Sequence, residues 1–473
     1  MSAILLLNGR LIDPANGIDA QKDLLLLGGK VAAVGESAAA AAPRGAQRLD
    51  LSGLVVCPGL IDPHVHLREP GQSAKETIGT GSAAAAKGGF TTVVCMPNTT
   101  PAIDTAGTVA LIQDKIERQA DINILIAGAI TKGLAGEELA PIGSLKGAGV
   151  VAITDDGHCI QNNELMRRAM EYARMFDLPL FDHCQDNHLV GEGLMNEGYW
   201  NMVLGLPGWP ASGEEIMVAR NIHLAELTGT HVHCQNISTV GSVRLLRDAK
   251  TRGLPVSGEA SPHYFALTDA SVAGSDAFWA EDGQDLLNFI QRPFETPEWP
   301  SYDTALKMTP PLRSASDRAA VVEAIAEGTI DIIGSDHAPH CNYEKEVEFD
   351  IAPFGITGLE TELSLSLGLL YHSGKMSLPA LIERFTLGPC KLLHLAKGNL
   401  APGQVADVTV FDPDVEWQFD RQQCLSKGKN TPFHGWPMRG KNAMTIVSGE
   451  VVWRDETRFQ TERSNPEGPT GSP

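Results

Sequence analysis

Residues 59–71 read Gly59-Leu60-Ile61-Asp62-Pro63-His64-Val65-His66-Leu67-Arg68-Glu69-Pro70-Gly71. Two histidines end an apolar run here, and because alternate residues of a strand face the same side, His64 and His66 point together. Neutral imidazole is a frequent zinc ligand, and Arg68 adds a guanidinium fork suited to a planar anion. A lone His-x-His pair is more often an ordinary strand pair, so the prediction of a metal site depends on the rest of the chain.

Seven further apolar runs follow this one, and helix-like stretches separate them. The eight runs span residues 55–66, 92–97, 123–128, 150–156, 180–183, 231–235, 255–260 and 331–336. Short apolar runs that alternate with helices indicate parallel β/α units. Eight such units over about 340 residues predict an α/β fold of the TIM (β/α)8 barrel type, whose catalytic groups come from the C-terminal ends of the strands.

Both ends of the chain are rich in short strand-like runs instead. Residues 1–56 and 399–455 are predicted to form one small β-sandwich from two segments, with residues 57–398 forming the barrel between them. Within the barrel, the aromatic and proline-bearing residues 275–305 are expected to be an inserted loop that acts as a lid or an interface. Residues 456–473 are expected to be a disordered tail.

Composition narrows the classes of partner. The net charge is −21, from 37 basic and 58 acidic residues among 473, which disfavours nucleic acid and anionic membranes as partners. No apolar run reaches the roughly 18 residues of a membrane-spanning helix, and the N-terminus does not resemble a signal peptide. Eight scattered cysteines without a Cys-x-x-Cys pair favour the reducing cytoplasm.

Other predicted strand ends carry residue types that bind metals. Asp155-Asp156-Gly157 ends the fourth run, His183 the fifth, and Asp336 the eighth. Taken alone, an Asp-Asp-Gly sequence is more often a turn, and a histidine at a strand end is more often satisfied by local hydrogen bonds. Several such ends on one face of a barrel favour a metal centre.

Six motifs are spread over the chain. They are His64–Gly71, Cys95–Thr99, Thr154–Gly157, Lys307–Arg313, Asp336–His340 and Ala352–Ile356. As a set they resemble dihydroorotase, of the bacterial class I type within the amidohydrolase superfamily, over nearly the whole chain. The resemblance implies a zinc-dependent cyclic amidohydrolase that interconverts N-carbamoyl-L-aspartate and L-dihydroorotate in pyrimidine biosynthesis. It also implies a TIM barrel with a small β-sandwich.

The resemblance further implies a set of metal ligands. His64, His66 and Asp336 would hold one zinc, Asp156 would bridge to a second zinc, and His183 would bind that second zinc. An aspartate stands where many relatives have a carboxylated lysine, and Asp336 would also be the catalytic base that becomes the acid. Asp155 is expected to be a structural neighbour that points the other way.

The implied substrate contacts are His66, Arg68, Asn98, Thr309, His340, Phe354 and Gly355. Arg68, with Asn98 and His340, would clamp the substrate carboxylate. The backbone of Phe354 and Gly355 would contact the pyrimidine ring. Thr309 stands where many relatives have asparagine, and its hydroxyl has a shorter reach. The alternative for Arg68 is a surface ion pair with Glu69 that has no part in substrate binding.

One implied ligand departs from the family pattern. The stretch His233-Cys234-Gln235-Asn236 has asparagine at the fourth histidine position, and an amide oxygen binds zinc less well than imidazole. His233 lies three residues away on the opposite side of the strand, so it cannot take over. A weak second metal on Asn236, a working one-metal enzyme and lost activity are all open. We expect retained activity with one tight and one weak zinc.

Two alternatives to a dihydroorotase remain open. A hydantoinase or allantoinase would share the His-x-His barrel, but such enzymes typically carry the bridging lysine and lack the Leu-Arg-Glu-Pro-Gly sequence that contains Arg68. A catalytically weakened subunit of an aspartate transcarbamoylase complex would typically have lost several ligands, whereas only the position of Asn236 departs here. Association with aspartate transcarbamoylase or into a homo-oligomer is compatible with an active enzyme.

Overall fold

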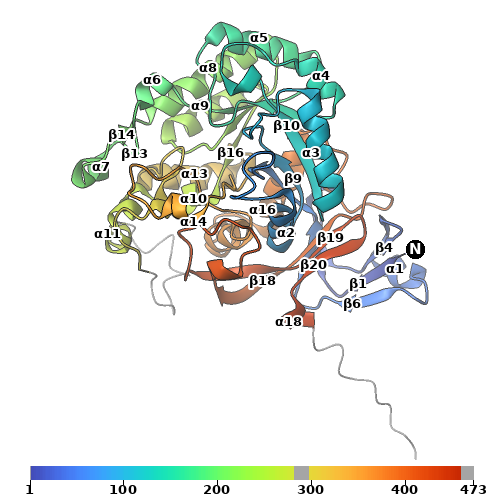
Figure 1. Ribbon diagram of the computed structural model, residues 1–473. Helices are drawn as coiled ribbons and strands as arrows, with labels where there is room; N and C mark the ends of the chain where they lie inside the picture. Colours follow the sequence, from blue (N-terminus) through green and yellow to red (C-terminus); the bar gives the residue numbers. More distant parts are fainter. Residues whose placement is uncertain (1, 282–297, 460–473) are drawn as a thin grey trace, which may run out of the picture.

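Eight parallel strands form the barrel in the computed structural model, which describes residues 2–281 and 298–459 (Figure 1). They are β8 (Leu60–Val65), β9 (Phe90–Cys95), β10 (Asn123–Gly128), β11 (Ala152–Thr154), β12 (Leu180–His183), β15 (Val232–Gln235), β16 (Val256–Ala260) and β17 (Ile332–Ile333). The backbone N–H of His66 donates to the carbonyl of His337 at 2.9 Å, so the segment after β17 returns to the first strand. Each of the eight predicted runs overlaps one barrel strand.

Helices connect successive strands of the barrel or follow its last strand. They are α2 (Ile78–Gly88), α3 (Ala106–Gln119), α4 (Ile142–Gly147), α5 (Asn163–Arg174), α8 (Ser212–Thr228), α9 (Val240–Thr251), α13 (Ala315–Glu327), α15 (Glu362–Ser366), α16 (Leu378–Phe385) and α17 (Leu387–Leu392). Polar side chains cap several of their N-termini, as at Thr77, where the hydroxyl accepts from the N–H of Thr80 at 3.1 Å. In the part of the chain described, no helix is long and apolar enough to cross a membrane.

Shorter elements leave the barrel between its strands. They are α6 (Asn187–Val190), β13 (Met195–Asn196), α7 (Tyr199–Leu204), β14 (Gly208–Trp209), α10 (Pro262–Ala266) and α14 (Asn342–Lys345). Figure 1 shows β13, α7 and β14 projecting from the body of the molecule. Because this excursion returns to the barrel, β12 pairs directly with β15, with Leu180 opposite Val232.

Two further sheets lie outside the barrel, and the second of them combines strands from both ends of the chain. One contains β5 (Lys30–Val34), β4 (Leu24–Leu27), β1 (Ala3–Leu7) and β6 (Gln47–Asp50). The other contains β20 (Glu450–Arg454), β19 (Pro437–Val447), β18 (Val408–Gln418), β7 (Val55–Pro58), β2 (Arg10–Asp13) and β3 (Ile18–Gln21). Buried Leu6, Leu24, Val408 and Ile446 share one core across the two sheets. The predicted fold class, a TIM barrel with a β-sandwich from both chain ends, is confirmed.

Two local predictions differ from the structure. Residues 275–281, predicted as part of an inserted loop, form α11 (Ser275–Glu281), and the rings of Phe278 and Trp299 pack 6.5 and 6.0 Å from that of Trp436. The described flanks of the predicted insertion are therefore anchored by aromatic packing. Residues 282–297 lie outside the described residues, so a lid or an interface stays a prediction.

The predicted disordered tail begins later than expected. Residues 456–459 form α18 (Glu456–Phe459), with Phe459 buried against the sandwich core, so the prediction was wrong for this turn. The apolar ring of Phe459 explains the difference, because it gives an otherwise polar segment a surface to bury. Residues 460–473 lie outside the described part of the chain.

Candidate active site

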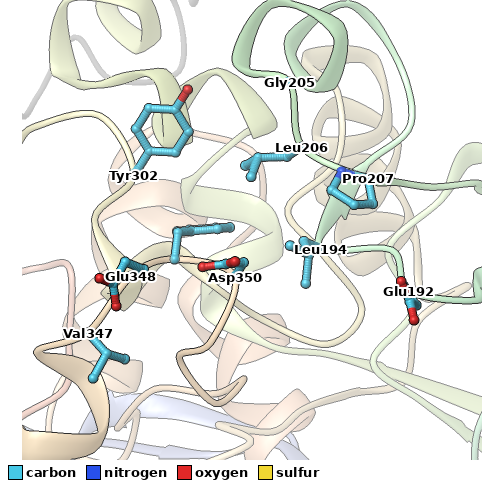
Figure 2. A pocket seen from close by; sticks show the side chains of 10 residues that line it. Glu192, Leu194, Gly205, Leu206, Pro207, Tyr302, Val347, Glu348 and Asp350 are labelled. Atoms are coloured by element: carbon cyan, nitrogen blue, oxygen red, sulfur yellow. The ribbon is translucent and has the colours of Figure 1, made fainter.

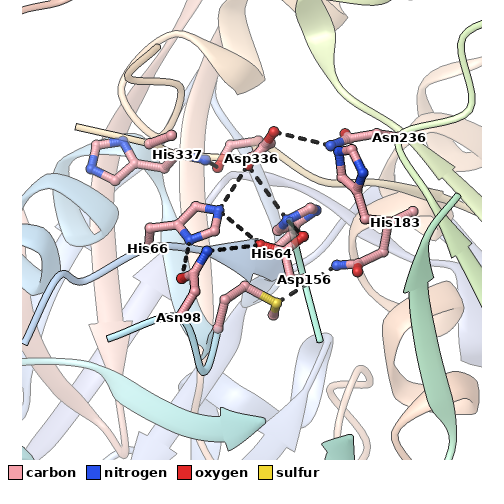
Figure 3. Close-up of polar contacts among 12 residues, drawn as sticks. His64, His66, Asn98, Asp156, His183, Asn236, Asp336 and His337 are labelled. Carbon is pink, nitrogen blue, oxygen red and sulfur yellow. Dashed lines mark hydrogen bonds and ion pairs between the residues drawn. The ribbon is translucent and has the colours of Figure 1, made fainter. Parts of the chain in front are cut away.

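Strand ends on one face of the barrel bring together His64, His66 and Asp156 (Figure 3). Ligand-type atoms of these three buried residues all lie within 4.8 Å of one another. Nε2 of His64 is 3.3 Å from Oδ1 of Asp156, and Nε2 of His66 is 3.5 Å from its Oδ2. Two imidazoles and a carboxylate are the donor set of many catalytic zinc sites.

Asp336 lies directly against the two histidines. Its Oδ1 is 3.0 Å from Nε2 of His66 and 3.4 Å from Nε2 of His64. The residue has a φ of 47°, a left-handed conformation that aspartate tolerates better than most residues. Burial alone would raise the pKa of Asp336, but the charge of His64 and the hydrogen bond from His66 hold it well below its usual value. The carboxylate is therefore ionised at neutral pH.

Oxygen acceptors contact Nδ1 of His64 and of His66, the ring nitrogen that faces away from the cluster. Nδ1 of His64 is 2.5 Å from Oε1 of Glu259, and Nδ1 of His66 is 2.9 Å from Oδ1 of Asn98. With Nδ1 protonated toward these oxygens, Nε2 of each ring faces the cluster. Nε2 of His64 is buried and has no hydrogen-bond partner. A buried, unpartnered imidazole nitrogen beside a carboxylate fits a metal ion.

The charges of the cluster also favour a cation. Burial lowers the pKa of His64, but the charges of Asp336, Glu259 and Asp156 raise it well above its usual value. Burial opposes ionisation of Asp156, but the charge of His64 brings the pKa of this carboxyl group to about 2. The arrangement thus stabilises positive charge in a buried place, and a divalent metal supplies such charge.

His183 and Asn236 lie beside this cluster (Figure 3). Nε2 of His183 is 3.1 Å from the carbonyl of Thr309, while its Nδ1 is buried without a partner. The amide of Asn236 donates through Nδ2 to Oδ2 of Asp336 at 3.0 Å, and its Oδ1 accepts from the hydroxyl of Ser261 at 2.8 Å. His183 therefore offers a free nitrogen, whereas Asn236 turns its amide N–H, not its oxygen, toward Asp336.

Asp155 has a different environment from its neighbour Asp156. One of its carboxylate oxygens accepts from the backbone N–H groups of Ile130 and Thr131, at 2.8 and 3.0 Å. Burial raises the pKa of Asp155 to about 6 against these hydrogen bonds. Its contacts are those of a residue that anchors the loop after β10.

Arg68 is buried beside the cluster. Its Nε donates to the carbonyl of Pro339 at 3.2 Å, and Nη2 is 3.5 Å from Nε2 of His340. Within the described residues no carboxylate lies within 4.0 Å of the guanidinium, and Glu69 pairs instead with Lys115 at 2.7 Å. The alternative of an Arg68–Glu69 ion pair is therefore not formed. The charge of Arg68 is available to an anionic ligand.

His340 joins Arg68 to the loop that carries Phe354 and Gly355. Its Nε2 is 2.8 Å from the carbonyl of Phe354, and burial, with the charge of Arg68, lowers the pKa of His340 to about 2. Gly355 has a φ of 107°, and an added Cβ would lie 2.7 Å from that of Ala338, so the position requires glycine. The loop is thereby held rigidly beside the site.

The backbone of Gly355 is already engaged by the protein. Its N–H donates to the carbonyl of Lys307 at 2.9 Å, and its carbonyl accepts from Nδ2 of Asn430 at 3.1 Å. A substrate contact here would use the second lone pair of the carbonyl. The predicted contacts through Gly355 and through the hydroxyl of Thr309 stay predictions.

Comparison with known proteins identifies the family. A family model described as dihydro-orotase-like matches residues 53–242. A dihydroorotase from Citrifermentans bemidjiense is 48% identical over 451 residues, which cover 95% of this chain and 99% of the relative. One from Pelotomaculum thermopropionicum is 46% identical over 452 residues, covering 96% and 99%. This chain belongs to the dihydroorotase family.

Solved structures of other cyclic amidohydrolases share the fold of this dihydroorotase-family chain. L-Hydantoinase from Arthrobacter aurescens superposes with a TM-score of 0.81 at 23% identity, and covers 96% of each chain. Dihydropyrimidinase from Brevibacillus agri superposes with a TM-score of 0.78 at 22% identity, covering 96% of this chain and 95% of its own. At this identity the likeness establishes the barrel and sandwich alone.

Three residues of the dihydroorotase-family site were missed by sequence reasoning. Glu259 holds His64, Lys75 lies 3.2 Å from Nδ1 of His340, and Asn430 bonds Gly355. A glutamate inside the apolar run 255–260 was a signal, because a charge in a buried strand needs a partner. Lys75 and Asn430 carried no such signal, since they lie far along the chain from their partners.

A cavity of about 750 Å³ lies away from the metal cluster. Figure 2 shows the carboxylates of Glu192, Glu348 and Asp350 among its lining residues, with Leu194 and Tyr302. None of the proposed ligands lines it, and three carboxylates would repel the anionic substrate of a dihydroorotase. The predicted substrate contacts, Arg68 among them, do not line this cavity either.

Proposed function

We propose that this chain is a zinc-dependent dihydroorotase of the bacterial class I type, which interconverts N-carbamoyl-L-aspartate and L-dihydroorotate in de novo pyrimidine (UMP) biosynthesis. The observation that carries the proposal is the buried guanidinium of Arg68, which has no carboxylate within 4.0 Å among the described residues and lies beside a three-residue metal cluster. A carboxylate of either substrate would satisfy that charge bidentately. The dihydroorotase that is 48% identical supports the same reaction.

In the proposed mechanism the residues hold the metal and move one proton. His64, His66 and Asp156 would bind zinc, together with Asp336, and zinc supplies Lewis acidity and a lowered pKa of water. In the hydrolytic direction, Asp336 takes the proton of the attacking water and then gives it to the ring nitrogen that leaves. The low pKa of Asp336 supports the first half of this role, because the group begins as a carboxylate.

Substrate orientation is assigned to the residues around Arg68. Its guanidinium would bind the carboxylate of the substrate. Burial and the charge of Arg68 keep His340 neutral by lowering its pKa to about 2, and it would donate to that carboxylate only by giving up its bond with the carbonyl of Phe354. Asn98 bonds His66 at 2.9 Å and Asp156 at 3.3 Å. We therefore assign Asn98 a part in holding these two ligands as well as in contacting substrate.

We propose one tight zinc and one weak second zinc. His183 supports a second metal, because its buried Nδ1 has no partner. Asn236 supports a weak one, because binding through its oxygen would require the amide to turn and lose the bond from Ser261. The turn would also point the oxygen at the carboxylate of Asp336, which is electrostatically unfavourable.

Two alternatives are less well supported. A hydantoinase shares the barrel, but the likeness to solved hydantoinases stays below 25% identity, and Asp156 and Arg68 favour dihydroorotate. A weakened subunit of an aspartate transcarbamoylase complex would not be expected to keep His64, His66, Asp156 and Asp336 together. We place the enzyme in the reducing cytoplasm, which the eight free cysteines support. Association into a homo-oligomer or with aspartate transcarbamoylase is compatible with activity.

Hydrolysis of L-dihydroorotate and of hydantoin, measured side by side at defined zinc, tests the proposal. We expect kcat/KM for dihydroorotate to exceed that for hydantoin by about 100-fold or more, because hydantoin lacks the carboxylate that Arg68 would bind. Preference for hydantoin would instead establish the hydantoinase alternative. Failure to hydrolyse either compound at saturating zinc, with co-purification of a transcarbamoylase, would establish the subunit alternative.

The variant Arg68→Ala tests whether the preference for dihydroorotate over hydantoin depends on this one side chain. Its KM for dihydroorotate should rise by about 10- to 100-fold, since a hydrogen bond to a charged group contributes about 1.5–3 kcal/mol, while kcat falls less. The neighbouring variant Glu69→Gln is the matched control, because Glu69 bonds Lys115 and the N–H of Ile78 and should leave KM near that of the wild type. Unchanged kinetics in Arg68→Ala would remove the clamp assignment.

A further inference from the structure

A continuous series of hydrogen-bonding side chains runs from the metal cluster into the barrel interior. Glu259 contacts His64 through Oε1 at 2.5 Å and His233 through Oε2 at 3.0 Å. Nδ1 of His233 is 2.8 Å from the hydroxyl of Ser257, which also lies 2.8 Å from Nε2 of His231. None of these four inner residues has a part in the proposed reaction, yet the series begins at a proposed ligand.

We propose that Glu259 is a positioning residue that holds His64 with Nδ1 protonated and Nε2 directed at the metal, and that His233 fixes Glu259 in turn. This inference rests on the proposed function, because it assumes that His64 binds zinc. It assigns a role to His233, the first histidine of the stretch in which Asn236 replaces a ligand.

The geometry of the neighbouring strands supports this assignment. β15 and β16 pair in parallel with His233 opposite Ser257, and Glu259 follows Ser257 by two residues, so the side chains of Ser257 and Glu259 share one face. His64, His233 and Glu259 are each 0% exposed. A buried carboxylate is costly unless hydrogen bonds satisfy it. Here each oxygen has one imidazole partner, which fixes the plane of the carboxylate.

The packing around His233 keeps the series rigid. Its ring contacts that of Phe181 edge-on, with centroids 5.0 Å apart. Ser257 contacts the nitrogen of His233 that Glu259 does not. His233 is thus held by the ring of Phe181 and at both nitrogens, so Glu259 has a fixed partner on the side away from the metal.

The two histidines of the His-x-His pair have chemically different outer partners. Nδ1 of His66 faces the neutral amide oxygen of Asn98, whereas Nδ1 of His64 faces the carboxylate of Glu259. An outer carboxylate fixes the tautomer of a ligating histidine and raises its basicity. His64 should therefore be the more basic ligand of the pair, and its orientation should depend on a residue 195 positions away along the chain.

Zinc affinity, measured by chelator competition, tests the role of Glu259 independently of catalysis. In Glu259→Ala the affinity should fall by about 10- to 100-fold, the range that outer partners of metal ligands supply. Glu259→Gln retains an oxygen that can accept from Nδ1–H of His64, so its zinc affinity should lie between those of Glu259→Ala and the wild type. Added zinc should restore the turnover of both variants, whereas it would not restore turnover to a protein that had unfolded.

Asp407→Asn is the matched control for a loss of buried carboxylate contacts. Asp407 bonds Lys397 and the N–H of Ser448, at the junction of barrel and sandwich. This variant should lower the melting temperature and leave zinc affinity unchanged. The proposal would be overturned if folded Glu259→Ala bound zinc with an affinity within about twofold of the wild type, because an outer partner is expected to have a larger effect. This outcome does not depend on which substrate the enzyme hydrolyses.

A measurement on the zinc-loaded wild type keeps the proposal testable if the variants do not fold. In protein labelled with 15N-histidine, the Nδ1 proton of His64 should resonate at lower field than that of His66, because its acceptor is a charged carboxylate at a shorter distance. The opposite order, or an unprotonated Nδ1 on His64, would overturn the proposal.

Discussion

The two halves of the proposed metal site differ in how completely their ligands are arranged. The first half consists of His64, His66 and Asp156, and the second half of His183 and Asn236. In the first half the ligand-type atoms lie within 4.8 Å of one another. In the second half one residue offers a free nitrogen and the other donates a hydrogen bond instead.

The difference does not lie in His183. Its Nε2 is fixed by the carbonyl of Thr309, so its Nδ1 is as well prepared for a metal as Nε2 of His64. Asn236 alone separates the halves, because its amide is held by Ser261 on one side and bonds Asp336 on the other. The position at which the resemblance implies a fourth histidine thus contacts the proposed base instead.

The variant Asp336→Asn gives the largest expected effect, because Asp336 contacts both halves. Loss of the proposed proton carrier should lower kcat in both directions by about 10²- to 10⁴-fold. Zinc affinity should fall as well, because Asp336 is a proposed ligand and an amide oxygen is a weak zinc donor. Turnover should therefore be measured at saturating zinc, with zinc content determined on the same sample. Turnover above about a tenth of the wild type would rule out general base catalysis by Asp336.

His66→Ala and His183→Ala compare the two halves directly. His66→Ala should lose the tight zinc, because it removes a ligand itself. Its activity should therefore fall by more than the about 10- to 100-fold expected for the loss of an outer partner of a ligand. His183→Ala should keep one zinc per chain and measurable turnover. Elemental analysis after dialysis, paired with activity, distinguishes the two. Equal zinc loss in both variants would contradict the comparison.

Much of the fold, and the residues of the first half of the proposed metal site, could be predicted from the sequence for one physical reason. Period-two and apolar patterns are local, so the strand ending in His64 and His66 could be predicted from its own residues. In the same way, Asp156 and His183 stand at the ends of local apolar runs, so their places at strand ends do not depend on distant residues. The family resemblance added roles that local patterns do not contain.

The remaining features depend on contacts between distant segments. Glu259 holds His64 across 195 positions, and the orientation of Asn236 depends on Ser261, 25 residues away. The helix over residues 275–281 was missed because an aromatic segment next to prolines resembles a loop, and its packing on Trp436 is not local. None of these contacts has a periodic signature.

Asn236→His has the smallest expected effect on turnover and isolates the difference between the halves. A histidine here should raise tightly held zinc from one to two per chain, because His183 already offers a nitrogen. The backbone φ of 52° at this position is left-handed, and histidine adopts it more readily than most residues do. Activity should change by less than about tenfold, since a hydrogen bond to Asp336 is exchanged for a metal contact.

The control Asn236→Ala removes the amide without adding a ligand. It should keep one zinc and lower kcat, because Asp336 loses a donor 3.0 Å from its Oδ2. If Asn236→His also holds a single zinc, the weakness of the second half lies in His183 or in the space around it, and not in the asparagine. If the wild type itself keeps two zincs after dialysis, the amide of Asn236 turns to bind metal, and the two halves are equivalent.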